Sequence, residues 1–143
     1  MIAVLLHVVA RGRIGRTAEA ELVDRYAKRI GWPLRMTELP ERGGNLPAPA
    51  NPMRLVLLDE KGTSLSSQGF ATLLGRWRDE GVREARFCIG AADGHDDVAR
   101  AGADLLLAFG NMTWPHLLAR AMLVEQLWRA TAIIAGHPYH RAG

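Results

Sequence analysis

The sequence predicts an α/β domain with a mostly parallel central sheet flanked by helices. Short apolar runs alternate with segments whose apolar residues recur at helical spacing, and this alternation continues along the chain. Several of the short runs are almost continuously apolar, as expected for strands that are covered on both faces. No internal repeat or composition break divides the 143 residues, so we expect one domain over residues 1–143.

Two strands and one helix are predicted in the first part of the chain. Residues 2–9 are almost entirely apolar and rich in valine, which is typical of a buried strand. A basic loop covers residues 11–16, and Thr17 can then cap a helix that extends to Gly31. Residues 34–39 alternate apolar and polar side chains and form the second predicted strand.

The middle of the chain contains a long loop, a strand and a helix. Residues 40–52 are rich in proline and glycine and are predicted to be a loop. Residues 55–58 form the third strand, which ends in a turn over residues 59–62. Ser66 or Ser67 can cap the next helix, whose apolar side chains recur at helical spacing until a glycine breaks it.

The last third of the chain contains two strands and two helices. Residues 85–89 form an apolar strand that leads into a glycine loop over residues 90–94. A short helix over residues 96–102 and a final strand over residues 104–109 follow. Residues 115–135 then form one long helix that is apolar on most of its circumference. Such a helix on a small domain usually has neighbours on two sides, which favours an oligomer interface.

Composition and charge are those of an ordinary soluble globular protein. The chain is 48% hydrophobic and 23% charged, and its net charge of +3 with a pI near 9.6 is compatible with a nucleic-acid partner. The single cysteine, Cys88, lies in an apolar run, which indicates an inert thiol in a reducing compartment. No apolar stretch reaches the roughly 18 uncharged residues that a membrane span needs, and no segment of the sequence resembles an export signal. We therefore expect a cytoplasmic protein.

The carboxyl ends of three predicted strands are candidates for a ligand site, because ligands bind beyond these ends in open parallel sheets. The three segments are residues 58–60, 90–94 and 109–114. The glycine loop has neither dinucleotide-binding nor P-loop spacing, and by itself it is more typical of an ordinary strand-to-helix turn. The break at Gly110-Asn111 predicts a tight bend with free backbone groups, which could hold an adenine ring by main-chain hydrogen bonds.

The C-terminal residues combine aromatic and titratable side chains, namely His137, Tyr139, His140 and Arg141. They lack nearby thiolates or a firm carboxylate partner, so no metal site is expected. A base-stacking and phosphate-contacting role suits Tyr139 and Arg141, and the histidines can transfer protons near neutral pH. A frayed terminus is the alternative on residue types alone.

Two further groups have a plainer interpretation. His7 lies within the first predicted strand and is expected to be a core or edge histidine. Arg11, Arg13 and Arg16 could contact RNA, but a solvated basic loop is the more common outcome for such a segment.

Several motifs, in their order and spacing, resemble the bacterial ribosomal RNA large-subunit methyltransferase H family. They are Ile89-Gly90, Met112-Thr113-Trp114-Pro115-His116, Arg120, Glu125-Gln126-Leu127-Trp128-Arg129-Ala130 and Pro138-Tyr139-His140-Arg141. Leu58-Asp59-Glu60-Lys61-Gly62 extends the match upstream, so the resemblance is specific over about residues 55–141. The family belongs to the SPOUT class, and the resemblance therefore implies a deep trefoil knot, here over about residues 85–135.

The resemblance also implies an activity, a cofactor and partners. Members of the family act as homodimers and transfer a methyl group from S-adenosylmethionine to N3 of a pseudouridine in large-subunit (23S) rRNA on the assembled ribosome. No metal is needed, because the sulfonium is already an activated methyl donor. By motif match, the cofactor would be held by Leu58, Gly90, Phe109, Gly110, Asn111, Met112, Thr113 and Trp114.

The same match assigns the C-terminal tail, residues 137–141, to the active site of the partner protomer. Tyr139, His140 and Arg141 of one protomer would reach toward the cofactor of the other. His140 is then our hypothesis for the group that removes the imide proton, with Tyr139 as the alternative. Arg141 would steady a phosphate or the developing anion.

Two departures from the family pattern leave other functions open. Ala91 stands where the family commonly has a second glycine, and residues 106–110 replace a serine-containing run. These changes suit a non-catalytic RNA-binding or ribosome-associated module that kept the fold without the cofactor. A third interpretation keeps the methyl transfer but changes the RNA.

Overall fold

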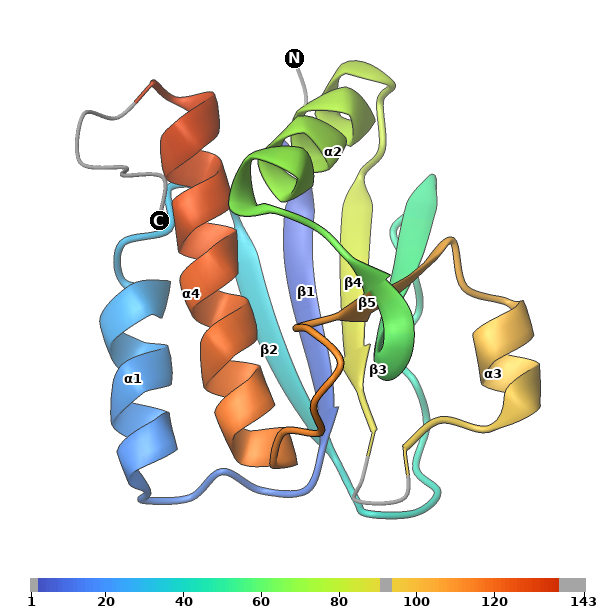
Figure 1. The fold of residues 1–143 in the computed structure, drawn as a ribbon. Helices are drawn as coiled ribbons and strands as arrows, with labels where there is room; N and C mark the ends of the chain where they lie inside the picture. The colour runs from blue at the N-terminus through green and yellow to red at the C-terminus, as the bar shows by residue number, and fades with distance from the viewer. Residues whose placement is uncertain (1–2, 91–93, 137–143) are drawn as a thin grey trace.

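The computed structural model describes residues 3–90 and 94–136, and it has the predicted alternation of strands and helices (Figure 1). The elements are β1 (Leu5–Arg11), α1 (Ala18–Ala27), β2 (Leu34–Leu39), β3 (Met53–Ser64), α2 (Ser67–Asp79), β4 (Glu84–Ile89), α3 (Asp97–Ala101), β5 (Leu105–Ala108) and α4 (His116–Ile134). Each element lies where the sequence predicts it, and the boundaries that differ most are those of α1 and β3.

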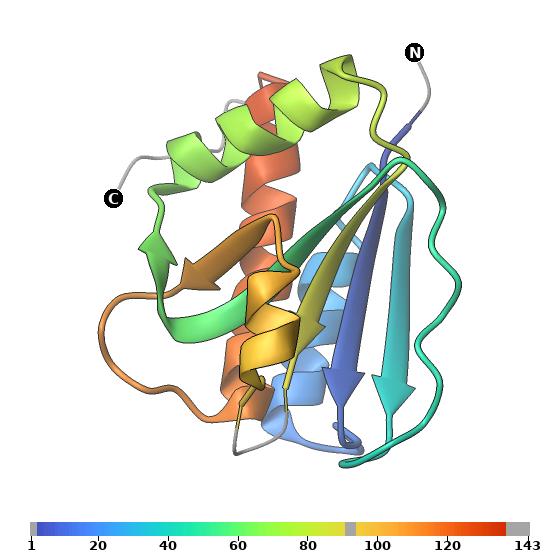
Figure 2. The same cartoon turned by 90° about the vertical axis from the view of Figure 1, so that its right-hand side faces the viewer.

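The strands form one sheet in the order β2-β1-β4-β3-β5, and every described pair of neighbours is parallel. Helices α1, α2 and α4 cover one face of this sheet, whereas α3 lies apart, on the side of β3 and β5. The predicted α/β fold with a parallel sheet is therefore confirmed. Strands β1, β2 and β4 end at the same edge of the sheet, whereas β3 bends near that edge and its last residues run back toward α2 (Figure 2).

Polar side chains cap three helices, two of which, capped by Thr17 and Ser66, have the cap that the sequence predicts. Thr17, Ser66 and Asp96 each accept a hydrogen bond from the amide three residues further on, at 3.1, 2.9 and 2.8 Å. Each bond satisfies one of the amides that a helix start leaves without an intrahelical partner. These three helix starts are thus encoded locally.

Two boundaries near the N-terminus differ from the prediction. Helix α1 ends at Ala27 and does not extend to Gly31, because the amides of Arg29 and Ile30 bond three residues back, at 3.0 and 3.2 Å, and tighten the chain into a turn. Strand β1 includes Arg11, which the sequence places in the basic loop, because this residue pairs with Leu39 of β2.

The largest difference concerns β3. The predicted turn over residues 59–62 is wrong, because the strand continues to Ser64. Leu58 and Thr63 both pair with Leu107 of β5. The four residues between them have no partner in β5 and form a bulge (Figure 2).

Helix α4 finds its apolar neighbours within the chain. It packs between α1 and α2, and its Leu123, Val124 and Leu127 are fully buried. Packing within the chain explains these buried residues, whereas Leu117, Leu118 and Met122 of the same helix are only half-buried. The oligomer interface stays a prediction. Within the part of the chain that the structure describes, no helix combines the length and apolarity needed to cross a bilayer.

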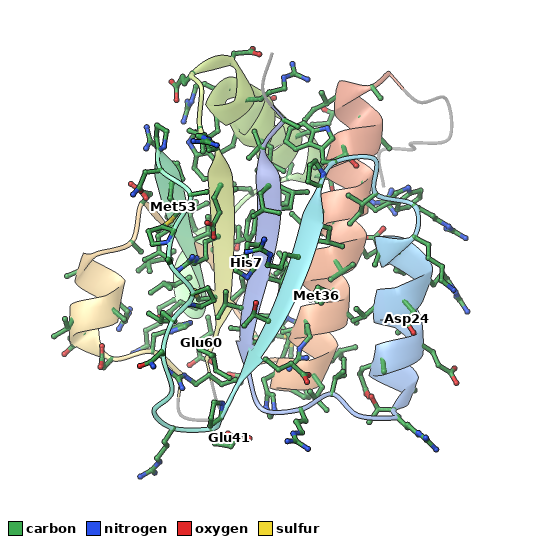
Figure 3. The ribbon with its side chains drawn as sticks, turned by 180° about the vertical axis from the view of Figure 1, so that it is seen from behind. His7, Asp24, Met36, Glu41, Met53 and Glu60 are labelled. Carbon is green, nitrogen blue, oxygen red and sulfur yellow. The ribbon has the colours of Figure 1, made fainter. Side chains whose placement is uncertain are left out.

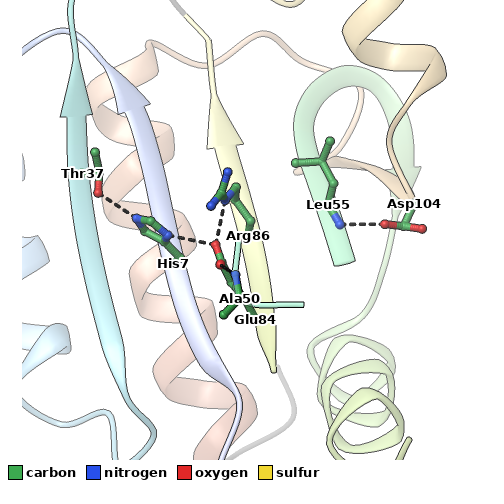
Figure 4. A network of polar contacts seen from close by, with 7 residues as sticks. All are labelled: His7, Thr37, Ala50, Leu55, Glu84, Arg86 and Asp104. Carbon is green, nitrogen blue, oxygen red and sulfur yellow. Dashed lines mark hydrogen bonds and ion pairs between the residues drawn. The ribbon is translucent and has the colours of Figure 1, made fainter. Parts of the chain in front are cut away.

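A buried polar network lies on the sheet face that the helices leave open (Figures 3 and 4). His7 is 0% exposed, which confirms it as a core histidine. Its Nδ1 donates to Glu84 at 2.9 Å and its Nε2 accepts from the Thr37 hydroxyl at 2.7 Å, an arrangement that satisfies a neutral ring. Glu84 also accepts from Arg86 Nε at 2.7 Å and from the Ala50 amide at 2.9 Å, and the latter bond ties the segment before β3 to the sheet.

The network predicts that the protein loses stability in acid in two stages. Burial lowers the pKa of His7 below its ordinary 6.5, so protons favour the unfolded chain as the pH falls below that value. Burial alone would raise the pKa of Glu84, but hydrogen bonds from Arg86, Ala50 and His7 lower it, so its contribution is lost below pH 4.5. Urea unfolding between pH 7 and about pH 3 should show both stages. In His7→Gln the first stage should shrink, and a wild-type stability that rose from pH 7 to pH 6 would contradict this account.

Candidate active site

A cavity of about 700 Å³ opens at the carboxyl edge of the sheet. Its walls are the bulge of β3, the ends of β4 and β5, the loop between β5 and α4, and the first turn of α4. This volume lies in the range of ligand sites in proteins, which is about 300–1,000 Å³. The cavity is at the edge where the topology of a parallel sheet predicts a ligand.

Most of the predicted cofactor residues come together here. Six of the eight line the cavity: Leu58, Gly90, Phe109, Met112, Thr113 and Trp114. Gly110 lines a smaller neighbouring cavity of about 180 Å³ instead, and Asn111 is exposed and lines neither. The predicted catalytic residues Tyr139, His140 and Arg141, like Ala91, lie outside the described residues.

The loop between β5 and α4 is a tight bend, as the sequence predicts. Trp114 Nε1 donates to the carbonyl of Phe109 at 2.9 Å and closes the bend on itself. Thr113 Oγ1 donates to Glu60 on β3 and holds the bend against the bulge. Among the described residues, the amides from Gly110 to Trp114 donate to no other protein group, so they are free to bind a ligand.

The bulge of β3 forms the opposite wall. Asp59 lies 2.9 Å from Nε of Arg100 on α3, and this ion pair fixes the short helix beside the cavity. Gly62 passes so close to β5 that a Cβ atom there would lie 2.5 Å from the carbonyl oxygen of Leu106. Only glycine fits this crossing, and the position of β5 in the cavity wall depends on it.

The floor of the cavity includes a second close approach. A Cβ atom at Gly90 would lie 3.0 Å from the carbonyl carbon and oxygen of Gly94. Both glycines line the cavity, so backbone surface is presented there without side chains. Such a surface lets a flat ligand lie directly against the main chain.

His95 also lines the cavity, although its residue type and spacing alone do not single it out. Its Nε2 lies 3.2 Å from the carbonyl of Cys88, which accepts only, so this nitrogen carries the proton and Nδ1 keeps a free lone pair. Burial lowers the pKa of His95, which keeps the ring neutral near pH 7. Its place next to Gly94, at the end of a predicted ligand loop, was the available signal. Burial also raises the pKa of the neighbouring Cys88 to about 11, as expected for an inert thiol.

Comparison with protein families shows which family the chain belongs to. A family model described as "Predicted SPOUT methyltransferase" matches residues 4–140, nearly the whole sequence. The chain belongs to the SPOUT methyltransferase family. The α/β fold with its parallel sheet agrees with this membership, and membership in the SPOUT family also implies the trefoil knot.

Individual SPOUT relatives are similar over almost their full length. A protein of Novosphingobium aromaticivorans is 69% identical over 140 residues, which cover 97% of this chain and 99% of the relative. One of Rhizorhabdus wittichii is 70% identical over 139 residues with the same coverage, and one of Brucella anthropi is 44% identical over 156 positions, covering 94% and 98%. All three carry the name ribosomal RNA large subunit methyltransferase H, so the resemblance seen in the motifs is confirmed.

The chemistry of this SPOUT cavity is that of a binding site for a flat, polar ligand. It offers free loop amides, glycine backbone and the neutral imidazole of His95. In the residues that the structure describes, no three histidine, cysteine or acidic side chains gather in a way that could hold a metal ion.

Proposed function

We propose that this chain uses S-adenosylmethionine to methylate N3 of a pseudouridine in large-subunit (23S) rRNA, on the assembled ribosome in the cytoplasm. One observation carries the proposal: the cavity lined by six residues of the family motifs, in a chain that belongs to a methyltransferase family. The names of the relatives support ribosomal RNA of the large subunit as the substrate.

The residues of the cavity fit S-adenosylmethionine. The volume of about 700 Å³ suits a ligand of this size. The free amides of the bend after Phe109 suit the edge of a purine, and the backbone at Gly90 suits a flat ring or ribose. When bound, S-adenosylmethionine supplies a methyl group that is activated by its sulfonium charge. The role of the chain is then to orient the acceptor nitrogen in line with that methyl group and to remove its proton.

The C-terminal tail is proposed to complete the site. Two copies form a homodimer, in which Tyr139, His140 and Arg141 of one protomer act at the cavity of the other. His140 removes the imide proton, with Tyr139 as the alternative, and Arg141 steadies a phosphate or the developing anion. Residues 1–143 act as one SPOUT domain with its knotted region over about residues 85–135.

Calorimetric titration with S-adenosylmethionine tests the proposal most directly. Binding in the micromolar range with one molecule per protomer is expected. The absence of binding would favour the non-catalytic RNA-binding module. Transfer of a labelled methyl group to ribosomes and to free rRNA then tests the substrate, and transfer to free rRNA alone would contradict action on the assembled ribosome.

A methyl group added at Gly90 should weaken cofactor binding without unfolding the protein. In Gly90→Ala the new Cβ would press on the carbonyl of Gly94 at 3.0 Å, so the loop must shift by a few tenths of an ångström. Strain of about 1–2 kcal/mol corresponds to a loss of affinity of about tenfold. Gly102→Ala is the matched control, because its Cβ would lie 3.7 Å from the nearest atom. Equal affinities of the two variants would exclude Gly90 from the binding surface.

A further inference from the structure

Two segments meet beside the cavity and form what we call the basic clasp, residues 11–16 and 40–44. Arg11 joins them, since its Nη1 donates to the carbonyls of Pro40 and Gly43 at 3.0 and 2.5 Å. The amide of Gly12 donates to the carbonyl of Leu39 at 2.8 Å. Figure 3 shows Glu41 of the second segment at the same end of the molecule as the loop that follows β1.

The clasp is anchored from below by a buried arginine of α4. Arg120 is 2% exposed, and it donates to Glu38 at 2.6 Å and to the carbonyl of Gly12 at 3.2 Å. The same oxygen of Glu38 accepts from the Ile14 amide at 2.8 Å. Burial would raise the pKa of Glu38, but the hydrogen bonds from Arg120 and Ile14 lower it, so the carboxylate is ionised. Its negative charge offsets the positive charge of Arg120. The anchor thus holds the backbone of the clasp without using its outer arginines.

The clasp borders the cavity. A Cβ atom at Gly12 would lie 3.9 Å from Nε2 of His116. His116 lines the cavity and begins the helix that carries Arg120. A polymer whose reacting base enters the cavity would therefore pass over or next to the clasp.

The charge of the clasp is strongly positive. It contains Arg11, Arg13, Arg16 and Arg42 against a single acidic residue, Glu41. Arg13, Arg16 and Arg42 are exposed, and within residues 3–90 and 94–136 none of them forms a hydrogen bond or ion pair through its side chain. A guanidinium presents a fork of donors that matches two oxygens of a phosphate.

We propose that the basic clasp binds the phosphodiester backbone of the RNA substrate next to the base that enters the cavity. Arg13, Arg16 and Arg42 bind the phosphates, and Arg120 is a positioning residue that holds the clasp. The inference rests on the proposed function, because it assigns substrate binding to the rim of the same site. Interactions of this kind are independent of base sequence and weaken as salt is added.

The test removes the positive charges of Arg13, Arg16 and Arg42. A control variant loses three positive charges at positions away from the cavity. The clasp variant is Arg13→Gln/Arg16→Gln/Arg42→Gln. The control variant is Arg35→Gln/Arg76→Gln/Arg83→Gln, whose arginines lie near the amino ends of β2 and β4 and in the last turn of α2, away from the cavity. Both variants have the same net charge. Three measurements apply to each: calorimetric binding of S-adenosylmethionine, binding of deproteinised large-subunit rRNA over a range of salt concentrations, and methyl transfer to ribosomes.

The clasp variant should bind S-adenosylmethionine like the wild type. Its affinity for rRNA should fall on the order of tenfold or more, and the slope of log affinity against log salt should decrease by about 0.7 for each phosphate that the variant no longer binds. In methyl transfer, KM should rise by a similar factor while kcat changes little. The control variant should keep the wild-type values apart from a small non-specific loss.

Each contrary outcome has a distinct meaning. If clasp and control variants lose rRNA affinity equally, or if the salt slope of the clasp variant is unchanged, the clasp is a solvated loop and the inference is wrong. If the wild type neither binds S-adenosylmethionine nor transfers a methyl group, the proposed function is wrong. The binding measurement with rRNA alone still decides the role of the clasp in that case.

Discussion

Glu84→Ala should lower the free energy of unfolding by about 3–5 kcal/mol, because it leaves a buried guanidinium without its counter-charge. The side chain of Glu84 is 2% exposed and that of Arg86 is 5% exposed, so solvent cannot replace the missing carboxylate. Nη2 of Arg86 already has no hydrogen-bond partner among the described residues. The variant would also leave Nδ1 of His7 and the Ala50 amide without an acceptor.

Urea unfolding of a second variant separates the effect of the charge from that of the smaller side-chain volume. Glu84→Ala/Arg86→Met removes both members of the ion pair, so it should recover part of the stability that Glu84→Ala loses. If Glu84→Ala itself does not fold, the recovery of a folded protein in the double variant is the expected sign. If Glu84→Ala lowers the free energy of unfolding by less than about 1 kcal/mol, the buried ion pair stabilises the protein no more than an exposed ion pair does.

Gly62→Ala is expected to disturb both the fold and the cavity. Its Cβ would lie 2.5 Å from the carbonyl oxygen of Leu106 and 2.9 Å from the amide nitrogen of Leu107, and both are backbone atoms that cannot rotate away. Either β5 or the bulge of β3 must move, at a cost of about 2–3 kcal/mol. Because Leu107 and Phe109 line the cavity, affinity for S-adenosylmethionine should fall together with stability.

Gly75→Ala is the matched control for this exchange. Gly75 lies inside α2, and a Cβ there would make only ordinary contacts with Ile134 at 3.9 Å. This variant should be as stable as the wild type or up to about 1 kcal/mol more stable, because alanine has a higher helix propensity than glycine. Chemical unfolding and calorimetric titration of both variants test the account. A Gly62→Ala protein with wild-type stability and cofactor affinity would contradict the close crossing of β3 over β5.

The sequence predicts the part of the candidate site that follows from the parallel arrangement of the strands. The ends of three apolar runs were expected at one edge of the sheet, and Leu58, Gly90 and Phe109 do line a common cavity. The tight bend between β5 and α4 was also readable from Gly110-Asn111 and the helix that begins so soon afterwards. Short-range chain geometry controls both features, so the sequence carries them directly.

Other parts of the site depend on residues that are far apart in the chain. Residues 59–62 have the composition of a turn, yet β3 continues because β5, more than forty positions later, pairs on both sides of the bulge. The charges on Arg120 and Glu38 have no local reason to meet, and they are 82 positions apart.

The order and type of the elements, two helix caps, the edge of the sheet that carries the site and the family of the chain can all be read from the sequence. These depend on side-chain periodicity, on capping within three residues and on motifs at short spacing. Three features appear only in the folded chain: the path of β3, the buried network of His7, Glu84 and Arg86, and the anchoring of the basic clasp by Arg120. The reason is physical. Each of these features arises where chain packing removes water from polar groups, and their partners come from strands and helices that become neighbours only when the sheet is assembled.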